Sequence, residues 1–305
     1  MHILISGSSG LVGSALRSHF AKDRHRVFRL VRRQPAGADE IAWDPASGTL
    51  DKSAIEGMDA VVHLAGTNLA SGRWTAERKR SIRESRIAGT LFLAQSIAQL
   101  KNPPKVFVSV SAVGYYGNRG ESELVEESGG GEGFLAELCR EWETATEAAS
   151  LRQIRVVIPR LGMVLSPDGG ALGLMLPIFR WGVGGRIGSG RQYMSWIAID
   201  DLVGMIDHAI HRETFQGPVN AVSPNPVTNR VFSKTLASVL SRPALFALPS
   251  FAARLVLGQM ADEVLLSSAK VSPAKLIGSG YSFRFPHLEG ALRHVLKRPG
   301  KNTAR

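Results

Sequence analysis

The first thirteen residues constrain the fold of this chain more than any other segment. His2-Ile3-Leu4-Ile5 is a short apolar run typical of a buried strand, and residues 11–22 carry a helical pattern. The turn between them reads Ser6-Gly7-Ser8-Ser9-Gly10-Leu11-Val12-Gly13. A strand, a Gly-x-x-Gly-x-x-Gly turn and a helix N-terminus together hold a pyrophosphate with backbone N–H groups and the positive end of the helix dipole. We therefore predict a dinucleotide site; a glycine-rich turn without a ligand is the alternative, and the flanking strand and helix disfavour it.

Strand and helix patterns alternate through the first half of the chain. Strands are predicted at 2–6, 27–31, 60–65, 106–110 and 154–158, and helices at 11–22, 75–100 and 133–149. This alternation predicts an α/β fold with a Rossmann doubly wound parallel sheet. Glycine and proline clusters interrupt the rhythm from about residue 166.

We expect an NADP-binding Rossmann core at 1–165, with a return segment at about 192–222. A smaller C-terminal substrate lobe would occupy mainly 166–297, and a frayed polar tail 298–305. A further helix is predicted at 201–211, with Asp200 and Asp201 as its cap.

Composition narrows the class of protein. The chain has 305 residues, a net charge of +11 and one cysteine, Cys139, so no intrachain disulfide forms. No run of eighteen apolar residues and no signal-peptide pattern are present, so we expect a cytoplasmic protein away from membranes. The basic residues are spread along the chain without a nucleic-acid-binding motif, so we expect no nucleic-acid partner. No metal site is predicted, and the chain is expected to be a monomer or a homodimer.

The residues after the second strand indicate which dinucleotide is bound. An acidic residue there binds the ribose 2′-OH of NAD, whereas arginine accommodates the 2′-phosphate of NADP. Here the sequence reads Val31-Arg32-Arg33, and no Asp or Glu follows until Asp39. NADP(H) is therefore predicted, with Arg32 as the main contact and Arg33 as support; solvated loop arginines are the alternative.

Two further strand ends are expected at the same edge of the sheet. Leu64-Ala65-Gly66 would let the adenosine half of the cofactor lie against backbone, and Ser109-Val110-Ser111-Ala112 would lie near the nicotinamide. Turn-forming hydroxyls are the alternative interpretation of Ser109 and Ser111.

Together with residues 196–202, these motifs resemble the extended short-chain dehydrogenase/reductase superfamily. Several others resemble more narrowly the SDR39U1-like or YfcH-like epimerase family with a C-terminal DUF1731 segment, here at about 248–296. The narrower motifs are Arg73-Trp74, Ser85-Arg86, Ser111-Ala112-Val113-Gly114-Tyr115-Tyr116-Gly117, Phe134-Leu135-Ala136-Glu137, Trp142-Glu143, Arg160-Leu161-Gly162 and Gly188-Ser189-Gly190. The resemblance implies NADP(H) contacts by Arg32, Leu64, Ala65, Ser81, Arg86 and Arg160. The shared helical face of Ile82 and Arg86 agrees with this role, although a solvated helix arginine is the alternative.

The proton-transfer pair of the wider superfamily is missing. Its Tyr-x-x-x-Lys motif lies on a helix, and residues 133–140 of this chain contain Phe134 and no tyrosine or lysine. We rank Ser111 and Tyr116 first and Tyr115 next as substitutes; the alternative is that the tyrosines only shape the pocket.

Residues 180–196 are predicted to form a substrate lid. Arg180, Arg186 and Arg191 would hold an anionic substrate, and Gln192, Tyr193 and Trp196 a sugar or ring; a mobile loop is the alternative. The leading hypothesis is an NADP-dependent oxidoreductase or epimerase acting on a small polar or nucleotide-linked substrate. The other is a non-catalytic NADP(H)-sensing or scaffold protein.

Overall fold

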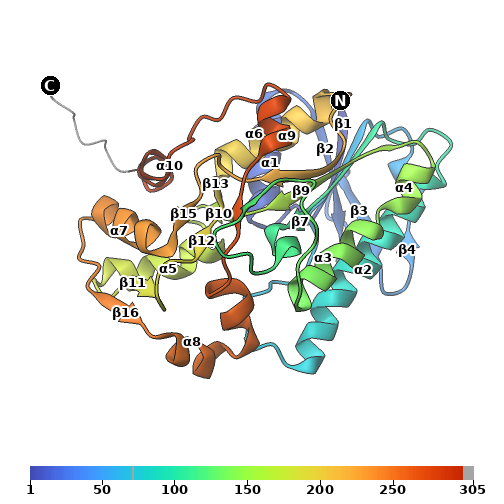
Figure 1. Ribbon diagram of the computed structural model, residues 1–305. Helices are drawn as coiled ribbons and strands as arrows, with labels where there is room; N and C mark the ends of the chain where they lie inside the picture. Colours follow the sequence, from blue (N-terminus) through green and yellow to red (C-terminus); the bar gives the residue numbers. More distant parts are fainter. Residues whose placement is uncertain (71, 298–305) are drawn as a thin grey trace, which may run out of the picture.

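The computed structural model describes residues 1–70 and 72–297. Its main sheet has the strand order β14-β9-β6-β5-β1-β2-β3-β4, and neighbouring strands are parallel except at β3 and β4 (Figure 1). The strands are β1 (His2–Ser6), β2 (Arg26–Val31), β3 (Glu40–Asp44), β4 (Thr49–Leu50), β5 (Ala60–His63), β6 (Val106–Ser109), β9 (Arg155–Leu161) and β14 (Gly217–Ala221), with β7 (Ser111–Ala112) also pairing with β9. The predicted α/β fold with a doubly wound parallel sheet is confirmed.

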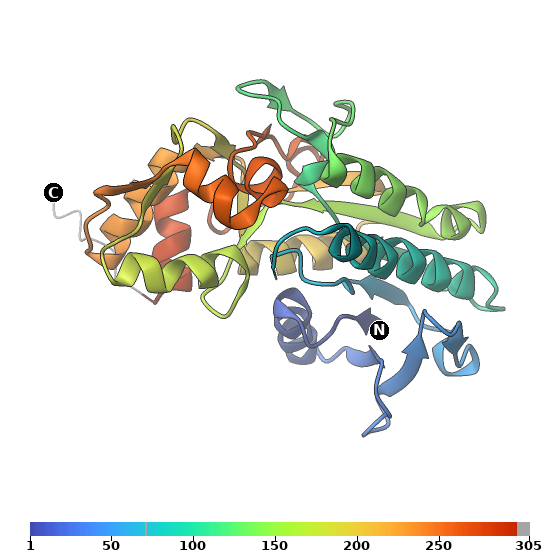
Figure 2. The same cartoon turned by 90° about the horizontal axis from the view of Figure 1, so that it is seen from below.

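Helices cover both faces of this sheet because successive strand residues point to opposite sides. Ile3 and Ile5 face α1 (Leu11–Lys22) and α6 (Ile199–His211), which pack against each other. Leu4 faces α2 (Ala76–Ala98) and α4 (Glu147–Leu151), and α3 (Phe134–Thr144) packs beside α2. Figure 2 shows α2 and α3 running side by side.

A smaller lobe with its own apolar core lies beside the sheet (Figure 2). Its helices are α5 (Gly170–Arg180), α7 (Asn229–Leu240), α8 (Ser250–Leu257) and α10 (Leu288–Val295). Its paired strands are β10 (Met163–Leu165) with β13 (Trp196–Ala198), β11 (Gly185–Ile187) with β16 (Phe246–Leu248), and β12 (Tyr193–Met194) with β15 (Val227–Thr228). Between the lobe and the sheet, β8 (Glu123–Leu124) pairs with β17 (Lys270–Val271), and α9 (Ala274–Gly278) packs near β14.

Three local predictions need correction or cannot be compared. The helix predicted at 133–149 is interrupted after Thr144, where the hydroxyl of Thr146 donates to the carbonyl of Glu143, 2.7 Å away, and competes with the helical pattern. Asp200 and Asp201 do not cap α6, because they lie inside its first turn and Ala198 is the cap residue. The predicted frayed tail at 298–305 lies outside the described residues.

None of the described helices has the length and hydropathy that a membrane span requires.

Candidate cofactor and substrate site

The glycine loop lies at the point where the sheet order reverses, between β1 and β5. Gly7 has φ +67°, and a Cβ there would approach the Leu64 carbonyl carbon to 2.8 Å. A Cβ at Gly13 would lie 2.3 Å from the Gly7 oxygen, so helix and loop pack as closely as backbone allows. Gly10 caps α1 without a side-chain hydrogen bond, and a Cβ there would meet only the Gly7 oxygen at 3.3 Å. The N–H groups of the first turn thus lack a capping side chain at the ligand edge of an open α/β sheet.

Arg86 is a buried cation without a counter-charge beside this loop. It is 7% exposed, and a Cβ at Gly66 would lie 3.2 Å from its Cζ. Its one hydrogen bond is weak, from Nη1 to the Ile82 carbonyl at 3.4 Å, and its Nε has no partner within the described structure. Burial lowers the pKa of Arg86 to about 10. A buried charge normally has an ionic partner, so this guanidinium next to the glycine loop fits the diphosphate of a dinucleotide.

Arg32 and Arg33 have different surroundings although they are adjacent. Arg33 donates to both carboxylate oxygens of Glu40, at 2.8 and 2.6 Å, and Arg29 pairs with the same group at 2.7 Å. Hydrogen bonds from the Ala36 N–H and from Arg33 lower the pKa of Glu40. Arg32 is exposed and makes no hydrogen bond or ion pair with the residues described. Arg32 is therefore the cation available to a 2′-phosphate, while Arg33 neutralises Glu40.

The other predicted cofactor residues lie around the same sheet edge, except Ser81, which lies on a different face of α2 from Arg86. Val31 ends β2, Leu64 and Ala65 follow β5, and Ser8 is buried in the loop while Ser9 is exposed. Ser81 is exposed on α2, about 140° around the helix from Arg86 at ~100° per residue. Its neighbour Ser85 accepts the N–H of Thr67 at 3.2 Å. The cofactor role of Ser81 stays a prediction.

Ser109 and His63 carry buried polar atoms at adjacent strand ends. They are paired in register across β6 and β5. The Ser109 hydroxyl and His63 Nε2 have no hydrogen-bond partner in the described part of the chain, whereas His63 Nδ1 lies 2.6 Å from the Ser6 hydroxyl. Burial lowers the pKa of His63 to about 4, so the ring is neutral at pH 7, as a core histidine should be.

The three predicted catalytic residues surround the buried guanidinium of Arg160. Arg160 donates to Glu143 through Nε at 2.9 Å and Nη2 at 2.8 Å. Ser111 donates to the same carboxylate at 2.8 Å, and the Tyr115 ring centroid lies 3.5 Å from the guanidinium carbon. Arg160 is thus held by an ion pair and an aromatic face, and its predicted cofactor contact remains a prediction.

Tyr116 is the most enclosed of the three. It is fully buried, donates to Asn220 Oδ1 at 2.7 Å and accepts from Arg160 Nη1 at 2.9 Å. Burial raises its pKa. This geometry favours the alternative that Tyr116 shapes the site. The half-buried phenol of Tyr115 makes no hydrogen bond in the described structure, which leaves its proton available.

An apolar cluster occupies the helix face that lacks the Tyr-x-x-x-Lys pair. Phe134 and Leu138 on α3 pack with Trp74, Ile82 and Met260. No group in this cluster can exchange a proton with a substrate, because the indole N–H of Trp74 donates to the Leu69 carbonyl at 3.0 Å. Proton transfer, if it occurs, must use residues elsewhere in the site.

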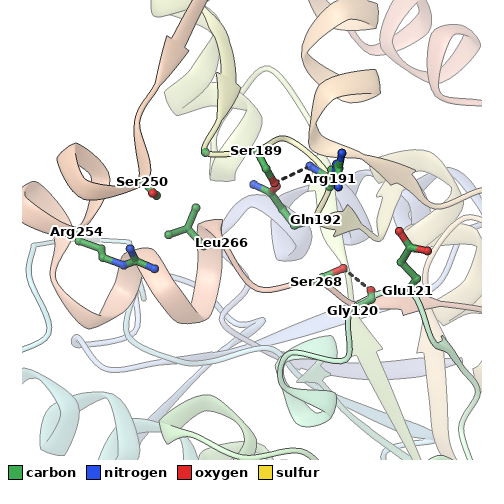
Figure 3. A pocket seen from close by; sticks show the side chains of 10 residues that line it. Gly120, Glu121, Ser189, Arg191, Gln192, Ser250, Arg254, Leu266 and Ser268 are labelled. Carbon is green, nitrogen blue, oxygen red and sulfur yellow. Dashed lines mark hydrogen bonds between the residues drawn. The ribbon is translucent and has the colours of Figure 1, made fainter.

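A cavity of about 440 Å³ lies between the predicted lid, the loop at 120–121 and the C-terminal segment (Figure 3). Arg191 and Arg254 line it, and Arg254 is paired with Asp262 at 2.8 Å. Gln192 also lines it, but its amide donates to the carbonyls of Ile187 and Leu265, both at 3.0 Å. Arg191 is thus the arginine of the predicted lid that lines this cavity, and the carboxylate-bearing Glu121 lines it as well.

The predicted contact of Trp196 with a substrate is wrong. This side chain is fully buried in the core of the smaller lobe and donates to the Asn225 carbonyl at 3.0 Å.

The other residues of the predicted lid have different surroundings. Tyr193 is half-buried in β12, Arg180 is exposed at the end of α5, and Arg186 donates to the Gly188 carbonyl. The segment is therefore anchored by strand pairing and side-chain bonds rather than free along its length.

The partners that fix these charged groups could not be predicted from the sequence. Glu143 was singled out only within the Trp142-Glu143 motif, without its contacts to Ser111 and Arg160, and nothing near Asn220 indicated a contact with Tyr116. Glu40 lies nine residues beyond Val31 in a strand that the apolar pattern did not reveal. All three contacts join residues from separate elements, so no short spacing in the sequence indicates them.

Comparison with known proteins finds relatives that cover nearly the whole chain. Residues 3–221 match the NAD dependent epimerase/dehydratase family, and residues 248–295 match DUF1731, a domain of unknown function. The chain is 43% identical over 300 residues to "Epimerase family protein ML0860" of Mycobacterium leprae, covering 98% of this chain and 97% of that protein. It is 37% identical over 299 residues to human "Epimerase family protein SDR39U1", covering 97% and 100%.

A solved structure of that human protein (isoform 2), with NADPH, superposes with a TM-score of 0.89 at 35% identity, covering 97% of this chain and 99% of that one. The relatives match both the sheet domain and the C-terminal segment.

Proposed function

Because this chain belongs to the SDR39U1-type epimerase family of extended short-chain dehydrogenase/reductases, with a C-terminal DUF1731 segment, we propose that it is an NADP(H)-dependent oxidoreductase or epimerase. Its substrate would be small and polar or nucleotide-linked. The bound cofactor would supply or accept a hydride. The glycine loop and Arg86 would bind its diphosphate, and Arg32 its 2′-phosphate.

The buried guanidinium of Arg86 is the observation that carries this proposal. A cation at 7% exposure without a carboxylate partner costs free energy unless an anion binds beside it. The uncapped N-terminus of α1 adds a second anion-binding element. It follows the glycine loop, which packs on Leu64 and Ala65, while Arg86 packs on the adjacent Gly66. The two elements bracket the end of β5, where the sheet order reverses.

Calorimetric titration of NADPH and NADH into matched variants tests the cofactor assignment. Arg86→Met should weaken both cofactors, because both contain the diphosphate. Arg32→Met should weaken NADPH by tenfold or more and leave NADH unchanged, since charged hydrogen bonds contribute about 1.5–3 kcal/mol. Arg83→Met is the control, because Arg83 lies on the same helix in an exposed pair with Glu141. Equal loss of both cofactors in Arg32→Met would contradict the assignment to the 2′-phosphate.

Turnover is tested separately. The purified protein with NADPH or NADP⁺ is incubated with carbonyl compounds and nucleotide sugars, and both cofactor absorbance and sugar isomers are followed. The exposed Arg191 at the 440 Å³ cavity favours anionic members of the panel. Arg191→Met should raise KM for the active substrate more than it lowers kcat. No turnover by any panel member would count against an enzyme.

The apolar cluster around Phe134 and Leu138 favours a second candidate, a non-catalytic NADP(H) sensor or scaffold. Such a protein would bind NADPH tightly, turn nothing over and change its affinity for a partner with cofactor redox state. Affinity capture with NADPH and with NADP⁺ distinguishes the two, because identical partners in both would exclude a redox-dependent scaffold.

The proposal also covers location and assembly. We propose a cytoplasmic monomer or homodimer with a small-molecule substrate, without a membrane or nucleic-acid partner. The single buried Cys139 and the dispersed basic residues support this view. Light scattering after gel filtration gives the oligomeric state. Retention on DNA that falls steeply with salt would contradict the absence of a nucleic-acid partner.

A further inference from the structure

Two helices bring three potential metal ligands, His19, Asp23 and Asp207, together far from the cofactor edge, with His211 beside Asp207. His19 and Asp23 lie one turn apart at the C-terminal end of α1, and Asp207 and His211 lie one turn apart at the end of α6. The two helices pack against each other (Figure 1). The glycine loop is at the opposite end of α1, a helix of 12 residues, so this cluster is separate from the cofactor site.

The donor atoms of His19, Asp23 and Asp207 all lie within 4.8 Å of one another, and the two distances from His19 match those between donors around a small metal ion. His19 Nε2 lies 3.5 Å from Asp23 Oδ2 and 3.4 Å from Asp207 Oδ2. Zinc binds histidine nitrogen and carboxylate oxygen at about 2.0–2.2 Å, so neighbouring donors of a tetrahedral site are about 3.4 Å apart. In contrast, hydrogen bonds between nitrogen and oxygen are usually 2.7–3.2 Å long.

The hydrogen bonding of the cluster is incomplete. His19 Nε2 is a buried atom without a hydrogen-bond partner in the described chain, and the two carboxylates reach it only at ion-pair distances. Asp207 Oδ1 also lacks a hydrogen bond but lies 3.2 Å from His211 Nδ1. Buried polar atoms of native proteins are nearly always bonded. A metal ion on His19 Nε2 would satisfy that atom and neutralise the adjacent carboxylates. Simple ion pairing of a protonated His19 is the alternative.

We propose that His19, Asp23 and Asp207 form a binding site for a divalent transition metal ion, with Zn²⁺ as the best match. An imidazole nitrogen with two carboxylate oxygens selects such ions over Mg²⁺, which prefers oxygen ligands and octahedral geometry. Water would complete the tetrahedron. His211 is a positioning residue, because its Nδ1 lies 3.0 Å from the Asp207 carbonyl and 3.2 Å from Asp207 Oδ1. The ion would join the ends of α1 and α6.

Metal titration of the full chain, freed of any affinity tag and treated with a chelator, tests the site. We expect one equivalent of Zn²⁺ to bind by calorimetry and to raise Tm, since a ligand bound only by the folded state stabilises it. Co²⁺ as a spectroscopic probe should give the intense visible absorption of tetrahedral coordination. His19→Gln and Asp207→Asn should each lose at least tenfold in Zn²⁺ affinity, and Mg²⁺ should not compete.

His294→Gln is the matched control. His294 and Asp200 form a separate, partly exposed histidine–carboxylate pair, with 3.1 Å between Nε2 and Oδ2, and they do not belong to the described group of three metal donors. Its removal should leave Zn²⁺ affinity unchanged. Unaltered Zn²⁺ binding in His19→Gln, or no saturable binding in the parent protein, would overturn the proposal and leave an ion-paired histidine. Circular dichroism of the same samples shows that each variant is folded and is independent of the outcome.

Discussion

Two buried arginines of this protein differ in how their charge is compensated. Arg160 is paired with Glu143, and the neighbouring ring of Tyr115 covers one face of its guanidinium. Arg86 has an aromatic neighbour, with Trp142 centred 5.1 Å from its Cζ, but no carboxylate in the described structure. The charge of Arg160 is compensated within the protein itself. The charge of Arg86 needs an anion from outside, which is why Arg86 and not Arg160 carries the proposed cofactor site.

Glu143→Ala should be strongly destabilising. It leaves the Arg160 guanidinium buried without its carboxylate, a change that costs about 3–5 kcal/mol. Glu141→Ala is the control on the same helix, because its pair with Arg83 is exposed and should contribute less than about 1 kcal/mol. Urea unfolding at pH 7 measures both. Similar small losses in the two variants would mean that Arg160 finds another partner.

The neutral core histidine makes stability depend on pH. The pKa of His63 falls from 6.5 to about 4 on folding, so the unfolded chain takes up a proton that the folded protein does not. Stability is therefore full above pH 6.5 and declines as pH falls toward 4, with a loss of about 2 kcal/mol between pH 7 and pH 5.

Urea unfolding at both pH values should show a smaller decline for His63→Gln than for the parent protein. His2→Gln, an exposed histidine in a neighbouring strand, should keep the parental decline. An unchanged decline in His63→Gln would show that other groups cause it.

At the scale of elements, the C-terminal segment completes a helix that lacks its own cap. Gly133 precedes α3 with φ +100° and no side-chain hydrogen bond. The carboxylate of Glu263 instead accepts the N–H groups of Phe134 at 3.2 Å and Leu135 at 2.8 Å. Glu263 belongs to a π-helical turn, Ala261–Leu265, within the DUF1731 match. Part of the structural role of the DUF1731 segment is therefore to cap the N-terminus of α3 beside the apolar cluster.

Removal of this cap should cost a typical capping energy. Glu263→Ala is expected to lower the free energy of unfolding by about 1 kcal/mol, as loss of an N-cap side chain does. Asp262→Ala, which removes the adjacent carboxylate from its exposed pair with Arg254, should change it by less than about 0.5 kcal/mol. Thermal unfolding followed by circular dichroism compares the two. Equal effects would mean that the cap contributes nothing beyond surface charge.

At the scale of the whole molecule, α6 links the sheet to the C-terminal end of the chain. The fully buried carboxylate of Asp201 accepts the N–H groups of Arg284 at 2.7 Å and Phe285 at 3.0 Å. The Tyr281 hydroxyl donates to the Asp201 carbonyl at 2.9 Å. The same helix packs on α1, which follows the glycine loop, so the sheet domain and the C-terminal segment share one support.

Asp201→Asn should loosen this connection. An amide has only one acceptor oxygen, so one of the two backbone N–H groups loses its bond. We expect faster amide exchange at residues 281–287 and earlier proteolytic cleavage there. Asp200→Asn, whose carboxylate is partly exposed and pairs with His294, should leave exchange in that segment close to the parental rate. Equal protection in both variants would contradict the anchoring role of Asp201.

Sequence patterns predicted the fold where the signals are local. The strand, glycine loop and helix at 2–22 are contiguous, so their apolar spacing and glycine positions are sufficient. The prediction of NADP rather than NAD is local as well, since it depends on Arg32 standing next to one strand end in place of an acidic residue. The short strands β3 and β14 escaped notice, because their packing depends on neighbours in the sheet rather than on a long apolar run.

The sequence by itself determined the parallel sheet, the dinucleotide loop and the absence of the Tyr-x-x-x-Lys pair, because each depends on residue type and short spacing. Tertiary structure alone decided that Arg86 is buried without a carboxylate and that Glu143 binds Arg160 and Ser111. It also brought His19 to Asp207. Burial and charge pairing are set by contacts between distant segments, and no local pattern encodes them.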